Sequence, residues 1–111
     1  MTDPVDHDTL QMLKEVMEDD FGKLIDAYLD DCEVKMPQLS QLLQARDFDQ
    51  LRRMAHSIKG SSSNFGAASL TDLCLRIELA ARDEAPEGLG ALIEAAEMEQ
   101  RRVAAALRQQ G

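Results

Sequence analysis

The chain has 111 residues, of which 44% are hydrophobic and 30% are charged, a balance that suits one domain with its own core. Lysine and arginine number 12 and aspartate and glutamate 21, so the formal net charge is −9. This acidic balance argues against binding to nucleic acid or to an anionic membrane, because both partners require a basic surface.

Nothing in the chain resembles a membrane span or a targeting segment. No apolar run approaches the length of a span, and the N-terminus is acidic and polar. Cys32 and Cys74 lie far apart within apolar helical patterns, which is typical of reduced core residues. We therefore expect a cytoplasmic protein without disulfides.

Residues 1–7 are predicted to form a loose tail, followed by a short helix. Asp8 and Gln11 form a capping box, with Asp8 at the N-cap and Gln11 at the third helical position. One side of this helix carries apolar residues at helical spacing, namely Leu10, Leu13 and Met17. The helix is short for a bundle member, so we expect it to lie across the end of a bundle.

A long helix is predicted after the acidic residues 18–20, since carboxylates complement the N-terminal helix dipole. Apolar residues recur at the spacing i, i+3, i+4, i+7 from Phe21 to Leu43, so the helix should reach about residue 45. Pro37 should kink this helix or split it in two near Lys35.

A second capping box, formed by Asp47 and Gln50, predicts the start of the next helix. This helix contains His56, and Gly66 lies at or just past its end. Two further helices are expected over residues 67–82 and 89–108, joined by a polar loop.

No segment shows sustained alternation with a period of two, so the predicted fold class is all-α. Four substantial helices with short connections favour antiparallel neighbours. The sequence thus predicts an up-down-up-down four-helix bundle with a short extra helix at the N-terminus.

Helix geometry places His56 on the outer face of its helix. With about 100° of rotation per residue from Leu51, the buried direction includes Met54 and Ile58, whereas His56 lies roughly 140° away. Its face carries no large apolar residue but several small or cationic ones, namely Arg52, Arg53, Lys59, Gly60 and Ser63. A histidine in such a position is ordinarily a solvated surface residue, so the neighbours must decide its role.

Two neighbours favour a role in chemistry. Lys59 and Arg52 lie one helical turn from His56 and would stabilise negative charge on it. Gly60 occupies a mid-helix position where glycine costs about 1 kcal/mol relative to alanine, and on an exposed face it packs against nothing. A neutral imidazole is a nitrogen nucleophile, so this arrangement predicts a phosphoryl group on His56 and space for a visiting partner.

Other chemistry lacks the necessary residues. A lone outward histidine cannot gather the ligands of a zinc or iron site, so no metal site is predicted. The serines after His56 have no second histidine with an orienting acid to activate them, and small polar packing residues are the simpler interpretation.

The stretch 55–70 resembles the signature of histidine-containing phosphotransfer (HPt) domains of two-component phosphorelays. The pattern His-x-x-Lys-Gly, with a further glycine six residues later, is filled by His56, Lys59, Gly60 and Gly66. The resemblance implies that His56 is the phospho-acceptor and that Lys59 supports the phosphoryl group. It also implies that Gly60 leaves room for a docking receiver domain and that Gly66 shapes the turn into the next helix.

The resemblance extends to the whole chain, because the family has a short N-terminal helix and then a four-helix bundle with the histidine on its second helix. Residues 1–111 are therefore expected to form a single HPt domain. The chain begins with Met1 and has no nucleotide-binding segment, so it resembles a stand-alone phosphotransfer protein rather than a kinase fragment. Family members often place a polar residue of the following helix beside the histidine, and Glu78 and Arg76 are both candidates.

The function that the resemblance implies is that of a phosphorelay intermediate. A receiver-domain aspartyl phosphate, as in a hybrid sensor histidine kinase, would donate its phosphoryl group to His56, which passes it to the receiver domain of a response regulator. The protein would be a monomeric phosphocarrier and not an enzyme, without a cofactor, since Mg²⁺ belongs to the partner receiver domain. The alternative is a helical adaptor or dimerisation bundle in which His56 is never phosphorylated.

The residues that could assist this function fall into three groups. Arg52 and Arg53 would add positive charge near the phosphoryl group and, with Lys59, steer an acidic partner. Ser63, like Gly60, would leave space for a docking partner because its side chain is small. Four apolar residues are candidates for the docking surface, with plain core packing as their alternative role: Leu10, Leu13, Met17 and Phe21.

Overall fold

The structure is a computed structural model that describes residues 3–110, all of whose regular elements are helices. They are α1 (His7–Met17), the 3₁₀ helix η1 (Glu18–Asp20), α2 (Phe21–Gln44), α3 (Phe48–Ser63), α4 (Ala68–Arg82) and α5 (Leu89–Arg108). The predicted bundle helices agree with these bounds to within a few residues.

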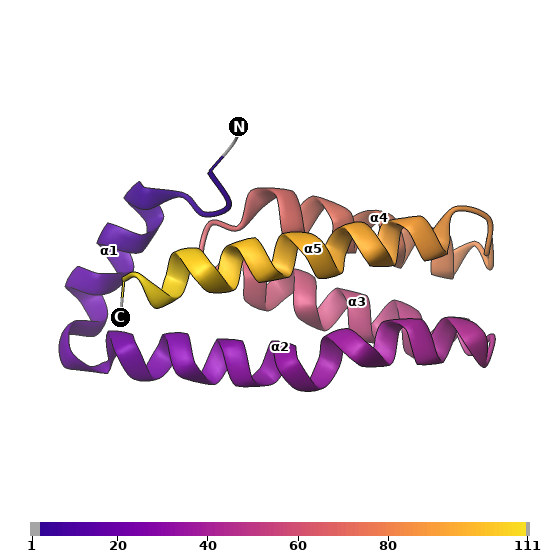
Figure 1. The fold of residues 1–111 in the computed structure, drawn as a ribbon, viewed down its shortest axis with the longest axis horizontal. Helices are drawn as coiled ribbons and strands as arrows, with labels where there is room; N and C mark the ends of the chain where they lie inside the picture. The colour runs from indigo at the N-terminus through magenta and orange to yellow at the C-terminus, as the bar shows by residue number, and fades with distance from the viewer. Residues whose placement is uncertain (1–2, 111) are drawn as a thin grey trace.

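The four long helices form an antiparallel bundle. They alternate in direction along the chain, and α1 lies across one end of the bundle beside the start of α2 (Figure 1). Each helix packs against the next, and α5 returns to α2, whereas α3 and α5 lie at opposite corners of the bundle. The predicted fold class, an all-α four-helix bundle with a short N-terminal helix, is confirmed.

A single core runs through the bundle and receives side chains from all four long helices. Its fully buried members are mainly leucine and isoleucine, namely Leu39, Leu51, Ile58, Leu70, Ile77, Leu89, Ile93 and Leu107. Each such side chain contributes about 1.5–3 kcal/mol relative to leaving it exposed. Cys32 and Cys74 are buried and free, as predicted, and burial raises the pKa of the Cys74 thiol to about 12.

The N-terminal segment differs from the prediction. The helix α1 begins at His7 with Asp6 as its N-cap, so the capping box assigned to Asp8 and Gln11 is wrong. Val5 is buried in the core, and the Asp6 backbone N–H donates to the Gly66 carbonyl at 3.0 Å. The tail is therefore not loose from Val5 onward, because contacts with a distant turn hold it. The first two residues of the predicted tail lie outside the described part of the chain.

Of the two outcomes predicted for Pro37, a kink or a split of the long helix, the split does not occur. Helix α2 is continuous from Phe21 to Gln44 with Pro37 inside it. Pro37 removes the N–H that would bond the carbonyl of Glu33, and both residues lie on the exposed side of the helix, where water can take that role. A search of the described residues finds no helix long and apolar enough to cross a membrane.

Candidate functional site

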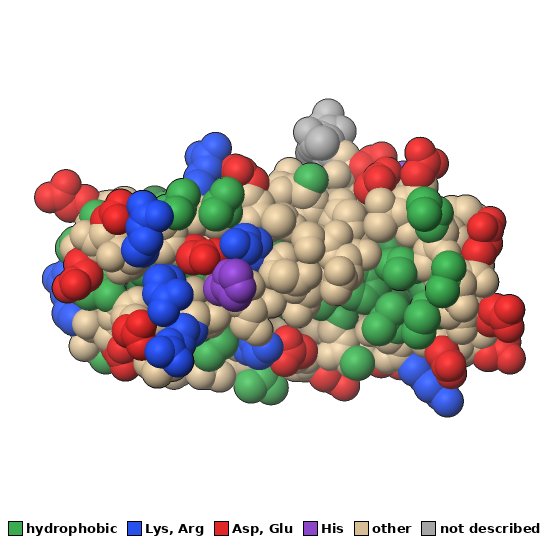
Figure 2. Space-filling model, turned by 180° about the vertical axis from the view of Figure 1, so that it is seen from behind, with side chains coloured by type: hydrophobic (Ala, Val, Ile, Leu, Met, Phe, Trp, Pro, Cys, Tyr) green, Lys and Arg blue, Asp and Glu red, His purple; other side chains and the backbone are tan. Residues whose placement is uncertain are grey.

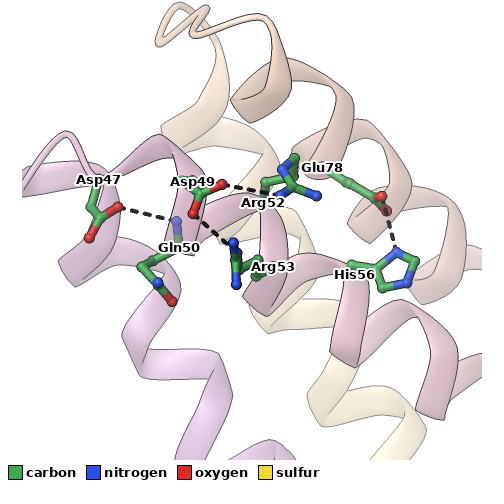
Figure 3. Close-up of polar contacts among 7 residues, drawn as sticks. All are labelled: Asp47, Asp49, Gln50, Arg52, Arg53, His56 and Glu78. Carbon is green, nitrogen blue, oxygen red and sulfur yellow. Dashed lines mark hydrogen bonds and ion pairs between the residues drawn. The ribbon is translucent and has the colours of Figure 1, made fainter.

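The helix that carries His56 starts where the capping box predicted. The Asp47 side chain accepts a hydrogen bond from the Gln50 backbone N–H at 3.2 Å, which fixes the first turn of α3 (Figure 3). His56 follows in the third turn, and its side chain is 65% exposed. The predicted outward orientation of His56 is confirmed.

One ring nitrogen of His56 is engaged and the other is open. Nδ1 lies 3.1 Å from Oε2 of Glu78 on the neighbouring helix α4, and Figure 3 shows the rest of the ring pointing away from that contact. Within residues 3–110, Nε2 has no hydrogen-bond partner. A carboxylate at Nδ1 favours the tautomer with its proton on Nδ1, which leaves the lone pair on Nε2 free to act as a nucleophile.

Glu78 joins His56 to Lys59. Its second oxygen, Oε1, lies 2.7 Å from the Lys59 Nζ, and the Glu78 side chain is only 17% exposed. Burial raises the pKa of this carboxyl, but the contacts with Lys59 and His56 outweigh that effect, so its pKa lies below the ordinary glutamate value. Glu78 is thus a carboxylate at neutral pH and can accept a hydrogen bond from Nδ1.

The structure separates the two candidates for the residue beside the histidine. Arg76 forms an ion pair with Asp72 on its own helix at 3.0 Å, whereas Glu78 touches His56. Sequence spacing alone could not decide this, because it does not give the rotation of α4 against α3.

The cationic surroundings of His56 differ from the predicted ring. Arg52 and Arg53 both pair with Asp49 at 3.1 Å, one to two turns before His56, and Figure 3 shows neither guanidinium against the imidazole. Lys59 is the predicted cation that the structure ties to the site, through Glu78. Any support of a phosphoryl group by the two arginines stays a prediction.

The two glycines of the motif serve different needs. A Cβ added to Gly60 would meet nothing within 4 Å, so contacts within the chain do not require a glycine there. Gly66 has a φ of +67°, and a Cβ there would lie 2.7 Å from the Cβ of Asp6. Gly66 is therefore needed for the turn between α3 and α4 and for the N-terminal segment that lies on it.

The serines after His56 are tied within the bundle. Ser63 donates to the carbonyl of Gly60 at 2.8 Å, and Ser61 donates to the carbonyl of Ser57 at 3.1 Å. Ser62 is buried and shares a 2.7 Å hydrogen bond with the hydroxyl of Tyr28. The predicted packing role of these residues agrees with these contacts, and the proposed steric allowance at Ser63 stays a prediction.

The predicted docking residues divide into two groups. Leu10 and Phe21 are only 2% and 4% exposed, so their place in the docking surface is wrong and they belong to the core. Leu10 is the buried residue of α1, and Phe21 is buried at the first position of α2. Leu13 and Met17 are half-buried and pack against the core.

The exposed apolar residues of α1 were missed. Met12 and Val16 are 67% and 77% exposed. With Thr9, Leu13 and Asn64, they line a groove of about 290 Å³ between α1 and the end of α3. Figure 2 shows an apolar area on the same face as the histidine, separated from it by small and polar side chains. Apolar residues that fall outside the buried stripe of an amphipathic helix were the available signal.

No group of three or more histidine, cysteine, aspartate or glutamate side chains within residues 3–110 is placed to hold a metal ion. The groups that the structure brings together at this site are one imidazole, one carboxylate and one ammonium group. These three groups lie on the facing surfaces of α3 and α4.

Solved structures of histidine-containing phosphotransfer proteins are similar to this chain. The crystal structure of histidine-containing phosphotransfer protein B from Pseudomonas aeruginosa PAO1 matches with 38% identity and a TM-score of 0.94, over 99% of this chain and 96% of that one. The maize histidine-containing phosphotransfer protein ZmHP2 shares the fold, with 21% identity and a TM-score of 0.85 over 96% and 88% of the two chains.

A curated relative is Multistep phosphorelay regulator 1 of Schizosaccharomyces pombe, which is 31% identical over 78 residues. That match covers 67% of this chain and 26% of the yeast protein, so the chain spans about a quarter of the length of this relative. Residues 23–110 match the Hpt domain family, and the chain belongs to that family.

Proposed function

We propose that His56 is the residue on which this phosphorelay intermediate carries its phosphoryl group, bonded to Nε2. The observation that carries the proposal is the exposed ring whose Nδ1 is held by Glu78 at 3.1 Å. The family assignment and the match to a phosphotransfer protein over nearly the whole chain support it further. The same findings favour the relay over a helical adaptor that is never phosphorylated.

The transfer would proceed as an exchange between nitrogen and oxygen. The Nε2 lone pair attacks the phosphorus of a receiver-domain aspartyl phosphate, and the phosphorus–oxygen bond breaks with its electron pair passing to the aspartate. The new nitrogen–phosphorus bond leaves a positive charge on the ring, whose Nδ1 proton faces the Glu78 carboxylate. The reverse exchange, with the aspartate of a second receiver, passes the phosphoryl group on.

The roles of the surrounding residues follow from their charges. Lys59, one turn after His56, supports the phosphoryl group by its positive charge. Arg52 and Arg53 contribute less, because each is paired with Asp49, whose negative charge partly cancels theirs. In this proposal the chain is a monomeric cytoplasmic phosphocarrier without catalytic machinery of its own. The partners are receiver domains of hybrid sensor kinases and response regulators, and they supply Mg²⁺.

The receiver would dock on the face that carries His56. Gly60 offers open space beside the histidine, and the groove between α1 and α3 offers exposed apolar side chains, Met12 and Val16 among them. Leu13 and Met17 remain as contributors at the margin of this surface. A docked receiver would cover both the imidazole and the groove, which would exclude water from the transferred group.

The proposal is tested by incubating the protein with a receiver domain phosphorylated with ³²P. We expect acid-labile label on the wild-type protein and none on His56→Gln. The matched control is His7→Gln, which removes the second histidine, an exposed residue of α1, and should leave labelling unchanged. Equal labelling of His56→Gln and wild type, or no transfer to wild type from any receiver, would contradict the proposal.

A further inference from the structure

Lys35 links α2 to α3 directly beside His56. Its Nζ lies 2.9 Å from the Asp31 carboxylate on its own helix and donates to the Ser57 hydroxyl at 2.6 Å. Ser57 is the residue after His56. The Lys35 side chain is about three-quarters buried, so the bond is partly shielded from water. The Hpt motif does not include this lysine, and spacing along the sequence does not place it near the histidine.

The link completes a set of polar contacts that hold α3 from both sides. On the α4 side, Glu78 contacts His56 and Lys59. On the α2 side, Lys35 holds Ser57, and Tyr28 holds the buried Ser62 farther along the helix at 2.7 Å. Helix α3 is therefore tied to both of its neighbours at the level of His56.

We propose that Lys35 is a positioning residue for phosphoryl transfer, and that it acts through Ser57. The inference rests on the proposed function of His56. In-line transfer requires the attacking nitrogen to meet the phosphorus within a narrow range of distance and direction, so a small shift of α3 against α2 slows the reaction. A charge-assisted hydrogen bond is shorter and stronger than a neutral one and suits this task.

The contact between Lys35 and Asp31 alone would not support this role. An ion pair four residues apart on one exposed helix contributes little to stability. Lys23 makes a local pair with Asp20, three residues earlier in η1, at 3.8 Å. Its side chain is 85% exposed, and within residues 3–110 it forms no ion pair with α3. Lys35 differs because it reaches a second helix, and Lys23 is for that reason its matched control.

The experiment compares Lys35→Met, Ser57→Ala, the double variant and Lys23→Met. Transfer from a phosphorylated receiver domain is followed as a function of receiver concentration, and thermal unfolding is monitored by circular dichroism. In parallel, His56 is phosphorylated by phosphoramidate, a small donor that does not depend on the docking geometry. Because Ser57→Ala removes the same link with a smaller change, it serves as the test if Lys35→Met fails to fold.

We expect each single variant to lower the transfer rate at saturating receiver by about fivefold or more, with phosphoramidate labelling within about twofold of wild type. The double variant should be no slower than the slower single variant, because both changes break one link. Lys23→Met should behave as wild type.

Three results would overturn the inference. In the first, Lys35→Met transfers as fast as Lys23→Met. In the second, the losses of the single variants multiply in the double variant. In the third, Ser57→Ala matches wild type while Lys35→Met raises only the half-saturating receiver concentration, which would make Lys35 a direct contact of the receiver. All three presuppose normal transfer to wild type, whereas failure of the proposed function would abolish that transfer.

Discussion

At the scale of single residues, the site depends on one carboxylate with two partners. Glu78 holds the imidazole with one oxygen and the Lys59 ammonium with the other. In the proposed transfer it would select the ring tautomer and offset the positive charge that phosphorylation of His56 would place on the ring. The sequence identified His56, Lys59 and Gly60 because they form a local motif, but Glu78 lies on another helix and was one of two candidates.

Replacing Glu78 should slow transfer in a graded way. Glu78→Gln keeps an oxygen that can accept from Nδ1 but loses the charge, whereas Glu78→Ala loses both. Hydrogen bonds to charged groups contribute about 1.5–3 kcal/mol, so we expect a loss of roughly tenfold or more for alanine and a smaller loss for glutamine. Single-turnover transfer from a phosphorylated receiver measures both, and equal rates for alanine and wild type would contradict the assigned role.

The same carboxylate has a signature in the dependence of stability on pH. Its pKa in the folded protein lies below the ordinary value of 4.5, so its charge stabilises the fold fully above that value. This contribution is lost as the pH falls through the lowered pKa. In urea unfolding, the stability difference between wild type and Glu78→Gln should therefore shrink in the acid range below 4.5. Glu94→Gln, a change at an exposed residue of α5, is the control.

The two glycines of the motif allow a paired prediction about stability and transfer. Gly60→Ala adds a methyl group in open space within a helix and should stabilise the protein by up to about 1 kcal/mol. Gly66→Ala combines a positive φ with a collision against Asp6 and should destabilise it by more than about 1 kcal/mol. Urea denaturation measures both changes.

Gly60→Gln should keep the helical circular dichroism spectrum yet slow phosphoryl transfer. An unchanged transfer rate would show that the open space at Gly60 is not needed for docking of the receiver.

At the scale of elements, local patterns predicted what depends on local chemistry. The capping residue Asp47 and the apolar spacing of α2 to α5 gave the long helices with nearly correct ends. The failure at the N-terminal segment involves contacts between distant segments. Val5 and Asp6 are ordered by the turn at Gly66, sixty residues away, and no periodicity in the first ten residues indicates this.

The prediction of the docking surface failed for a related reason. A stripe of apolar residues on a short helix can face the core or a partner, and the sequence does not say which. Leu10 and Phe21 face the core, whereas Met12 and Val16 are exposed and are therefore our candidates for the docking surface. The bridge from Lys35 to Ser57 was likewise invisible, because it depends on the register of α2 against α3.

At the scale of the whole molecule, one face of the bundle carries both His56 and the apolar groove between α1 and α3. Helix α3 presents the histidine, and α1 at the bundle end presents the apolar groove, on one face (Figure 2). Helix α5 occupies the opposite corner of the bundle from α3. A receiver domain bound over His56 would therefore leave α5 exposed to solvent, and this asymmetry provides an internal control for the docking surface.

Replacing Met12 and Val16 together by serine should weaken the receiver complex without disturbing the fold. Met12 is 67% exposed and Val16 is 77% exposed, so the loss of these side chains opens no cavity in the core. Lost burial at about 25 cal/mol per Å² predicts a rise of roughly tenfold in the half-saturating receiver concentration, with the saturating rate unchanged. Met98→Ser on α5, where Met98 is 65% exposed, removes a similar side chain on the opposite corner and should have no effect. If both variants behave alike, the receiver does not use the groove between α1 and α3, and docking rests on the surface immediately around His56.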